Sequence, residues 1–124
     1  TIQYVKNNPA IESISINFYT PFPDAENLMI TRKQREEVID TVIRMKREGY
    51  PIMNSISGLR LMKYNRFKRR CWVTNFIYAD HKRANCAGEE LGICSDCGLC
   101  MAGEMNAVFN FCPDTILAGL KLRL

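Results

Sequence analysis

Residues 31–51 read TRKQREEVIDTVIRMKREGYP, and this stretch decides the fold because it contains the clearest helix of the chain. Thr31 is a favoured N-cap residue, and Gln34 can reach back to complete a capping box. Gly49 suits the position after a helix, and Pro51 forbids continuation. We therefore predict a helix over residues 32–48.

The side chains of this helix divide into two faces. Apolar side chains recur with the period of an α-helix, at Val38, Ile39, Val42, Ile43 and Met45. Charged side chains occupy most other positions and are mostly expected to face water: Arg32, Lys33, Arg35, Glu36, Asp40 and Arg44. One face is thus predicted to pack against a core.

Short β-rich segments flank the helix on both sides. Residues 13–19 (SISINFY) are typical of a buried strand and lead into a proline-containing loop over residues 20–27. Residues 51–55 (PIMNS) indicate a second strand. A strand, a helix and a strand make a βαβ unit with parallel strands and a right-handed crossover, so we predict the α/β class.

The remaining segments add few elements. We predict a short helix over residues 58–63, a strand over 72–78, a short helix over 104–111 and an apolar closing segment at 115–121. These elements are too few to close a barrel or to cover both faces of a parallel sheet. We therefore expect residues 1–70 to be late strands and helices of a partial parallel (β/α) barrel, followed by a small cysteine-rich metal-binding region at 71–124.

The composition is that of an ordinary globular domain. The chain has 124 residues, of which 47% are hydrophobic and 24% charged, which suffices for one core. It contains no apolar run of about 20 residues and no basic-then-apolar leader, so we expect neither a membrane span nor a signal peptide. In the cytoplasm, thiols stay reduced and available to metal, which disfavours the alternative of a three-disulfide scaffold.

A basic run at residues 63–70 (KYNRFKRR) concentrates much of the net charge of +4. With Tyr64 and Phe67 interleaved, such a run is one way to contact nucleic acid. Charge elsewhere is mixed rather than gathered on one face, which favours a solvated loop anchored to the core by its two aromatic side chains. Nucleic acid is therefore not the expected partner.

The cysteines indicate a metal site. All six lie in residues 71–112, and residues 94–100 read CSDCGLC. Thiols three residues apart in a turn converge on one point, as iron–sulfur clusters and zinc both require. Crowding at this spacing favours an iron–sulfur cluster, because structural zinc sites of the ribbon type use two well-separated pairs.

Four ligands close such a site. Cys86, Cys94 and Cys97 are the firm candidates, since Gly98 lets the chain turn tightly and two glycines can bend the loop after Cys86. The fourth ligand stays open among three further cysteines, Cys71, Cys100 and Cys112. For Cys71 and Cys112 the alternative is a small buried hydrophobic side chain.

No other residues form a catalytic pattern. His81, the single histidine, stands in a charged turn and is expected to be solvated rather than to bind zinc. Glu104 is either an acid at a helix N-terminus or a carboxylate with a role near the cluster. The sequence has no Ser-His-Asp or Cys-His-Asn arrangement and no phosphate-binding glycine loop.

Several segments together carry a family resemblance. They are residues 15–24 (SINFYTPFPD), the helix at 31–48, residues 50–55 (YPIMNS), Cys71-Trp72 and the downstream cysteine loop. In this order they resemble the carboxyl-terminal half of a radical S-adenosylmethionine (SAM) protein. The cysteines look like the auxiliary-cluster region, of the SPASM or Twitch type, that many such enzymes carry after the barrel.

The resemblance implies an auxiliary 4Fe–4S cluster for electron relay or substrate binding. Its ligands would be Cys71, Cys86, Cys94 and Cys97, with Cys100 as a substitute. The C-x3-C-x2-C motif of the SAM-cleaving cluster is absent, so this chain alone is not expected to cleave SAM. In the full-length protein, the strand ends would line the SAM and substrate cavity. That role falls to Asn17 and Ser55, whose alternative is hydrogen bonding within the sheet.

The implied partner is the N-terminal barrel half of the same protein or a separate partner chain. The substrate would be a small molecule or a peptide. A different class of function is a non-enzymatic zinc-binding module, in which the basic run before Cys71 contacts a partner or nucleic acid. Metal content separates the two hypotheses.

Overall fold

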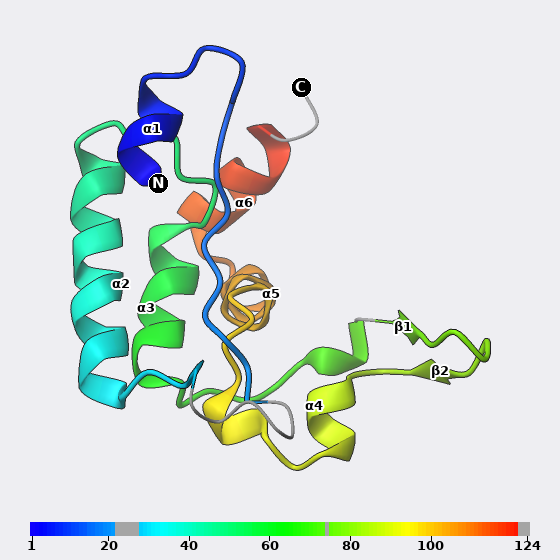
Figure 1. The fold of residues 1–124 in the computed structure, drawn as a ribbon. Coiled ribbons are helices and arrows are strands. Elements are labelled where there is room, and N and C mark those ends of the chain that lie inside the picture. Colours follow the sequence, from blue (N-terminus) through cyan, green and yellow to red (C-terminus); the bar gives the residue numbers. More distant parts are fainter. Residues whose placement is uncertain (22–27, 74, 122–124) are drawn as a thin grey trace.

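The computed structural model describes residues 1–21, 28–73 and 75–121 (Figure 1). Its helices are α1 (Ile2–Lys6), α2 (Arg32–Arg47), α3 (Ile56–Tyr64), α4 (Ala87–Glu90), α5 (Met101–Phe109) and α6 (Pro113–Lys121). Two 3-10 turns, at Cys71–Val73 and Cys94–Asp96, and two short strands, β1 (Phe76–Ile77) and β2 (Arg83–Ala84), complete this part of the chain. Most of the loop predicted over residues 20–27 lies outside the described residues.

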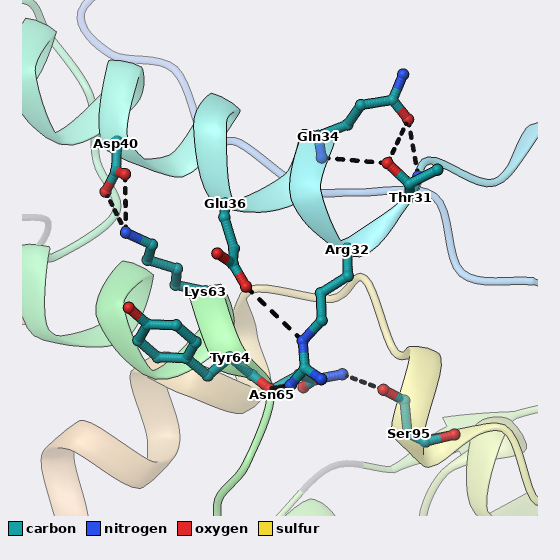
Figure 2. Close-up of polar contacts among 9 residues, drawn as sticks. All are labelled: Thr31, Arg32, Gln34, Glu36, Asp40, Lys63, Tyr64, Asn65 and Ser95. Carbon is teal, nitrogen blue, oxygen red and sulfur yellow. Dashed lines mark hydrogen bonds and ion pairs between the residues drawn. The ribbon is translucent and has the colours of Figure 1, made fainter.

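The helix predicted over residues 32–48 is confirmed as α2. The Gln34 backbone donates to Thr31 Oγ1 (3.2 Å) and the Thr31 backbone donates to Gln34 Oε1 (2.8 Å), so the capping box is present (Figure 2). Two side-chain assignments were wrong: Val38 is 42% exposed, whereas Arg35 is only 9% exposed. Arg35 precedes Ile39 by one helical turn, which places it on the buried face.

The two predicted parallel strands meet at a single bridge. Ile14 pairs with Ile52 in parallel and makes two backbone hydrogen bonds of 2.9 Å to that segment. Farther along, the Asn54 side chain replaces a backbone partner: the Ile16 backbone N–H donates to Asn54 Oδ1 (2.7 Å), and Asn54 Nδ2 donates to the Ile16 carbonyl (3.2 Å). The segments therefore run parallel as predicted, but neither is a regular strand, because a side-chain amide ends the backbone ladder.

The strand predicted over residues 72–78 was wrong over its first part. Cys71–Val73 forms a 3-10 turn, and only Phe76–Ile77 is a strand, which pairs antiparallel with Arg83–Ala84. Three predicted segments are helical with shifted ends, namely residues 58–63 in α3, 104–111 in α5 and 115–121 in α6. Within the described residues the only sheet is this two-stranded pair, so the barrel assignment stays a prediction.

The core lies around α3, which packs against α2 on one side and against α5 on the other (Figure 1). Its buried side chains are Ile39, Val42, Ile43, Ile52, Leu59, Met62 and Cys100. Helices α3 and α5 approach closely because glycines face each other: a Cβ on Gly103 would stand 2.5 Å from the Gly58 carbonyl oxygen. No helix in the described parts of the chain has the length and apolar character needed to cross a membrane.

Carboxylates from α5 and α6 hold the N-terminus of α3. The Ser55 hydroxyl accepts from the Gly58 backbone (2.9 Å) as the N-cap. Glu104 accepts from the Ser55 backbone (2.9 Å) and hydroxyl (2.6 Å). Asp114 accepts from the backbone (2.9 Å) and hydroxyl (2.6 Å) of Ser57. Residues on both sides of position 70 thus form one packed unit.

Candidate metal centre

Side chains from α2 and from the end of α3 hold the backbone of residues 94–97, which we call the cysteine loop. Its four successive carbonyl oxygens accept hydrogen bonds from three residues. Arg69 donates to the carbonyl of Cys94. Asn65 donates to the carbonyls of Ser95 (2.6 Å, Figure 2) and Cys97. Arg35 donates to the carbonyls of Asp96 (3.2 Å) and Cys97 (3.1 Å). The loop backbone is therefore fixed from its carbonyl side.

The extended segment at residues 17–20 holds the chain just after this loop. The Gly98 N–H donates to Thr20 Oγ1 (3.0 Å), and the Phe18 N–H donates to the Gly98 carbonyl (2.9 Å). The Cys100 N–H donates to Asn17 Oδ1 (3.0 Å). A Cβ at Gly98 would overlap the Phe18 carbonyl, so only glycine fits at this close approach.

Four thiols form one electrostatic group, made of Cys71, Cys86, Cys94 and Cys97. Burial, followed by repulsion from the other three thiolates, raises the pKa of Cys71 to about 11. Burial also raises the pKa of Cys94; Arg69 offsets part of this rise, and Cys86 and Cys97 add to it. Cys71, Cys86 and Cys97 line one cavity, and Cys94 precedes Cys97 by three residues in the cysteine loop, so we call these four cysteines the four-thiol group.

A cavity of about 460 Å³ adjoins this four-thiol group. Cys71, Cys86 and Cys97 line it, together with apolar side chains and the polar side chains of Asn17, Arg70 and Asn75. The cavity brings residues from the start, the middle and the end of the chain to one place. Three of the six cysteines of the chain line it.

The other two cysteines are placed differently. Cys100 is 1% exposed and belongs to the apolar core. Burial, followed by repulsion from Glu104, raises its pKa to about 12, and Cys97 adds to this rise. Cys112 precedes α6 and is separated from Cys100 by the whole of α5. Neither cysteine lines the cavity beside the four-thiol group.

The spread of the thiols bears on which metal they suit. Among the described residues, no three His, Cys, Asp or Glu side chains are arranged to hold a single metal ion. Zinc–sulfur bonds of about 2.3 Å draw tetrahedral thiolates to about 4 Å from one another. A 4Fe–4S cluster binds each thiolate through a different iron and so accepts a wider spacing.

Two arginines supply positive charge beside the thiols. Arg69 Nη1 and Arg70 Nε are buried and have no hydrogen-bond partner among the described residues. The guanidinium groups lie over aromatic rings, Arg69 over Phe67 (4.4 Å) and Arg70 over Phe109 (4.5 Å). A cluster bound by four thiolates is anionic, so buried cationic donors without partners match its charge.

The basic run is therefore used partly inside the molecule. Lys63 pairs with Asp40 at 2.8 Å (Figure 2), and Phe67 packs against the core as predicted. Tyr64 is 52% exposed, so the second predicted anchor was wrong. His81 is exposed in the β1–β2 turn, as predicted for a solvated histidine.

The two residues assigned to SAM lie in different environments. Asn17 lines the cavity beside the four-thiol group and also a neighbouring cavity of about 250 Å³. Ser55 is 1% exposed, and its hydroxyl contacts Gly58, Glu104 and Thr115. The hydroxyl of Ser55 is thus engaged in the packing of α3, whereas the side chain of Asn17 borders open space.

The residues that hold the cysteine loop were not predicted from the sequence. Arg35 carried a signal, because its spacing from Ile39 and Val42 is helical. Asn65 carried another: it follows α3 with a φ of 53°, and asparagine is favoured in this conformation at helix ends. Arg69 had no such signal, since it stands in a run of basic residues.

No protein-family model, curated protein or solved structure matches the chain. The functional argument therefore depends on the residues of the site itself.

Proposed function

We propose that this chain binds a 4Fe–4S cluster through Cys71, Cys86, Cys94 and Cys97 and serves as the auxiliary-cluster region of a radical SAM enzyme. The observation that carries the proposal is that Cys71, Cys86 and Cys97 line one cavity, with Cys94 three residues before Cys97 in the cysteine loop. Among the described residues, the buried Arg69 Nη1 and Arg70 Nε have no hydrogen-bond partner, and Arg70 lines the cavity, which supports an anionic group there.

The chemistry that such a cluster supplies is electron relay or substrate binding. The proposal includes a cytoplasmic setting, because reducing conditions keep the four thiols available. It also includes a parallel (β/α) barrel that is completed by a preceding half of the same protein or by a partner chain. Exposed apolar side chains of α6 support the presence of this second part, which would cover them; Leu117 is 58% and Leu120 53% exposed. SAM would be cleaved in that other part, with Asn17 and Ser55 at its cavity.

Metal content tests the proposal directly. We expect chain purified without oxygen and supplied with iron and sulfide to hold about four irons and four sulfides. It should show the broad visible absorbance of an iron–sulfur cluster and, after reduction, an electron paramagnetic resonance (EPR) signal. A colourless protein with one zinc ion would instead support the zinc-binding module and contradict the cluster.

Single cysteine variants identify the ligands. We expect Ala at position 71, 86, 94 or 97 to remove most of the bound iron. Cys112→Ala and Cys100→Ala are the matched controls, because each removes one thiol from outside the four-thiol group. Both should keep the iron content of the parent chain. Loss of iron in Cys100→Ala, with the helical circular dichroism unchanged, would make Cys100 a ligand and contradict the proposed set.

A further inference from the structure

We propose that Arg69 is the positive charge that sets the reduction potential of the cluster. This inference rests on the proposed function and assigns a role to a residue that binds no metal. Arg69 acts through the cluster ligands and is therefore a positioning residue for charge rather than a catalytic one.

The guanidinium of Arg69 is fixed in place. Its Nη2 donates to Asn65 Oδ1 (2.6 Å) and to the Cys94 carbonyl, and its plane lies over the Phe67 ring at 4.4 Å. Its Nη1 is buried and lacks a hydrogen-bond partner within the described residues. A buried N–H of a cation without a partner is costly unless an anion approaches it. The structure thus holds a guanidinium at the cysteine loop whose Nη1 can donate to a further acceptor.

The charge of Arg69 acts on the proposed ligands. Arg69 Nη2 donates to the carbonyl of Cys94, and Arg69 stands two residues before Cys71 in the chain, so its positive charge lies beside two of the proposed ligands. One-electron reduction, for example by dithionite, adds one negative charge to the cluster without making or breaking a bond. A fixed positive charge stabilises the reduced state more than the oxidised state. Arg69 therefore raises the reduction potential.

The neighbouring arginines do not share this arrangement. Arg66 is exposed and lines a different cavity, with Tyr19 and Arg32. Arg70 lies over Phe109 and borders the cavity, but does not bond the backbone of the cysteine loop in any described contact. Arg66 thus offers a control in which the same charge is lost from the same basic run.

The test is a potentiometric titration of the cluster, followed by EPR. We expect Arg69→Gln to lower the reduction potential by at least about 59 mV. For a one-electron reduction, this shift of about 59 mV changes the equilibrium constant tenfold. Arg66→Gln should shift it by a small fraction of this, because an exposed charge is screened. Arg69→Lys, which keeps the charge, should stay near the parent potential.

The possible outcomes separate the two proposals. A parent chain that holds no cluster contradicts the proposed function and this inference together. A cluster whose potential is the same in the parent and in Arg69→Gln overturns this inference alone. Where Arg69→Gln binds no iron, Arg69→Lys decides: a cluster at the parent potential supports the role of the charge. No cluster, or a lowered potential, in Arg69→Lys overturns it.

Discussion

Two carboxylates at the N-terminus of α3 differ in how folding changes their protonation. Burial raises the pKa of Glu104 above its usual value of 4.5, although hydrogen bonds from Ser55 act in the opposite direction. Burial also acts to raise the pKa of Asp114, but hydrogen bonds from Ser57 outweigh it and bring the pKa below the usual 3.8. The two acids therefore make opposite contributions to the pH dependence of stability.

We predict that Glu104→Gln and Asp114→Asn have opposite effects on how the unfolding free energy depends on pH. The folded state binds a proton on Glu104 more tightly than the unfolded state does. Its contribution is therefore present below pH 4.5 and lost as the pH rises through the raised pKa. The contribution of Asp114 is present above pH 3.8 and lost as the pH falls through its lowered pKa.

Urea unfolding of the apo chain from acid to neutral pH measures both effects. In the parent chain, Glu104 makes the unfolding free energy fall as the pH rises above 4.5, and Glu104→Gln should remove this fall. Asp114 makes the unfolding free energy fall as the pH drops below 3.8, and Asp114→Asn should remove that fall. Each variant is the control for the other, because both lose one carboxylate at the same helix end. If both variants changed the slope of unfolding free energy against pH in the same direction, the pKa values of Glu104 and Asp114 would not be shifted in opposite directions.

At the scale of elements, the crossing of α3 and α5 depends on the absence of side chains. A Cβ on Gly103 would stand 2.5 Å from the Gly58 carbonyl oxygen and 2.7 Å from Met62 Cγ. We predict that Gly103→Ala lowers the unfolding free energy by about 1–3 kcal/mol, since the packed helices must move apart. Urea denaturation of the apo chain measures the change.

Gly119 in α6 is the matched control for this prediction. It is also helical, but a Cβ there would meet nothing within 4 Å. Gly119→Ala should therefore gain up to about 1 kcal/mol from helix propensity alone. If Gly103→Ala were as stable as Gly119→Ala, the close approach of α3 and α5 would not be needed for packing.

The elements that could be predicted from the sequence are those whose signals are local. Thr31 and Gln34 determine the start of α2 by bonding each other, so this helix was predicted closely. The strands at 13–19 and 51–55 depend on a partner backbone, and the side chain of Asn54 takes that partner's place. Such a substitution is a tertiary event, which no periodicity in the sequence signals.

The candidate site was predictable to the same degree. The spacing of Cys94 and Cys97 pointed to the cysteine loop, and the glycine-containing loop after Cys86 pointed to that residue. Cys71 was left open beside Cys100 and Cys112, because a single cysteine carries no spacing signal. The side chains that bond the loop backbone, Arg35 and Asn65, belong to segments that are distant in sequence. Arg69 stands in a run of basic residues and was expected to be solvated. Its burial depends on how Phe67 packs against the core, which the sequence pattern does not specify.

At the scale of the whole molecule, the cysteine loop is bonded to the helices that form the core. Arg35 reaches from α2 to the carbonyls of Asp96 and Cys97, and Asn65 reaches from the end of α3 to Ser95. A ligand that binds only the native arrangement of the loop stabilises every element coupled to it. Cluster binding and helix stability should therefore be linked across the chain.

We predict that loading the cluster moves the unfolding of the helices, followed by circular dichroism, to higher denaturant concentration. Arg35→Gln should reduce this displacement, because it removes two partly buried hydrogen bonds, worth about 1–3 kcal/mol together, that connect α2 to the loop. Arg44→Gln is the matched control on α2, where the exposed side chain should leave the displacement unchanged. A parent chain whose helices unfold at the same denaturant concentration with and without the cluster would show that the loop and the helices are independent units. In that case the hydrogen bonds from Arg35 would hold the loop without coupling its metal to the fold.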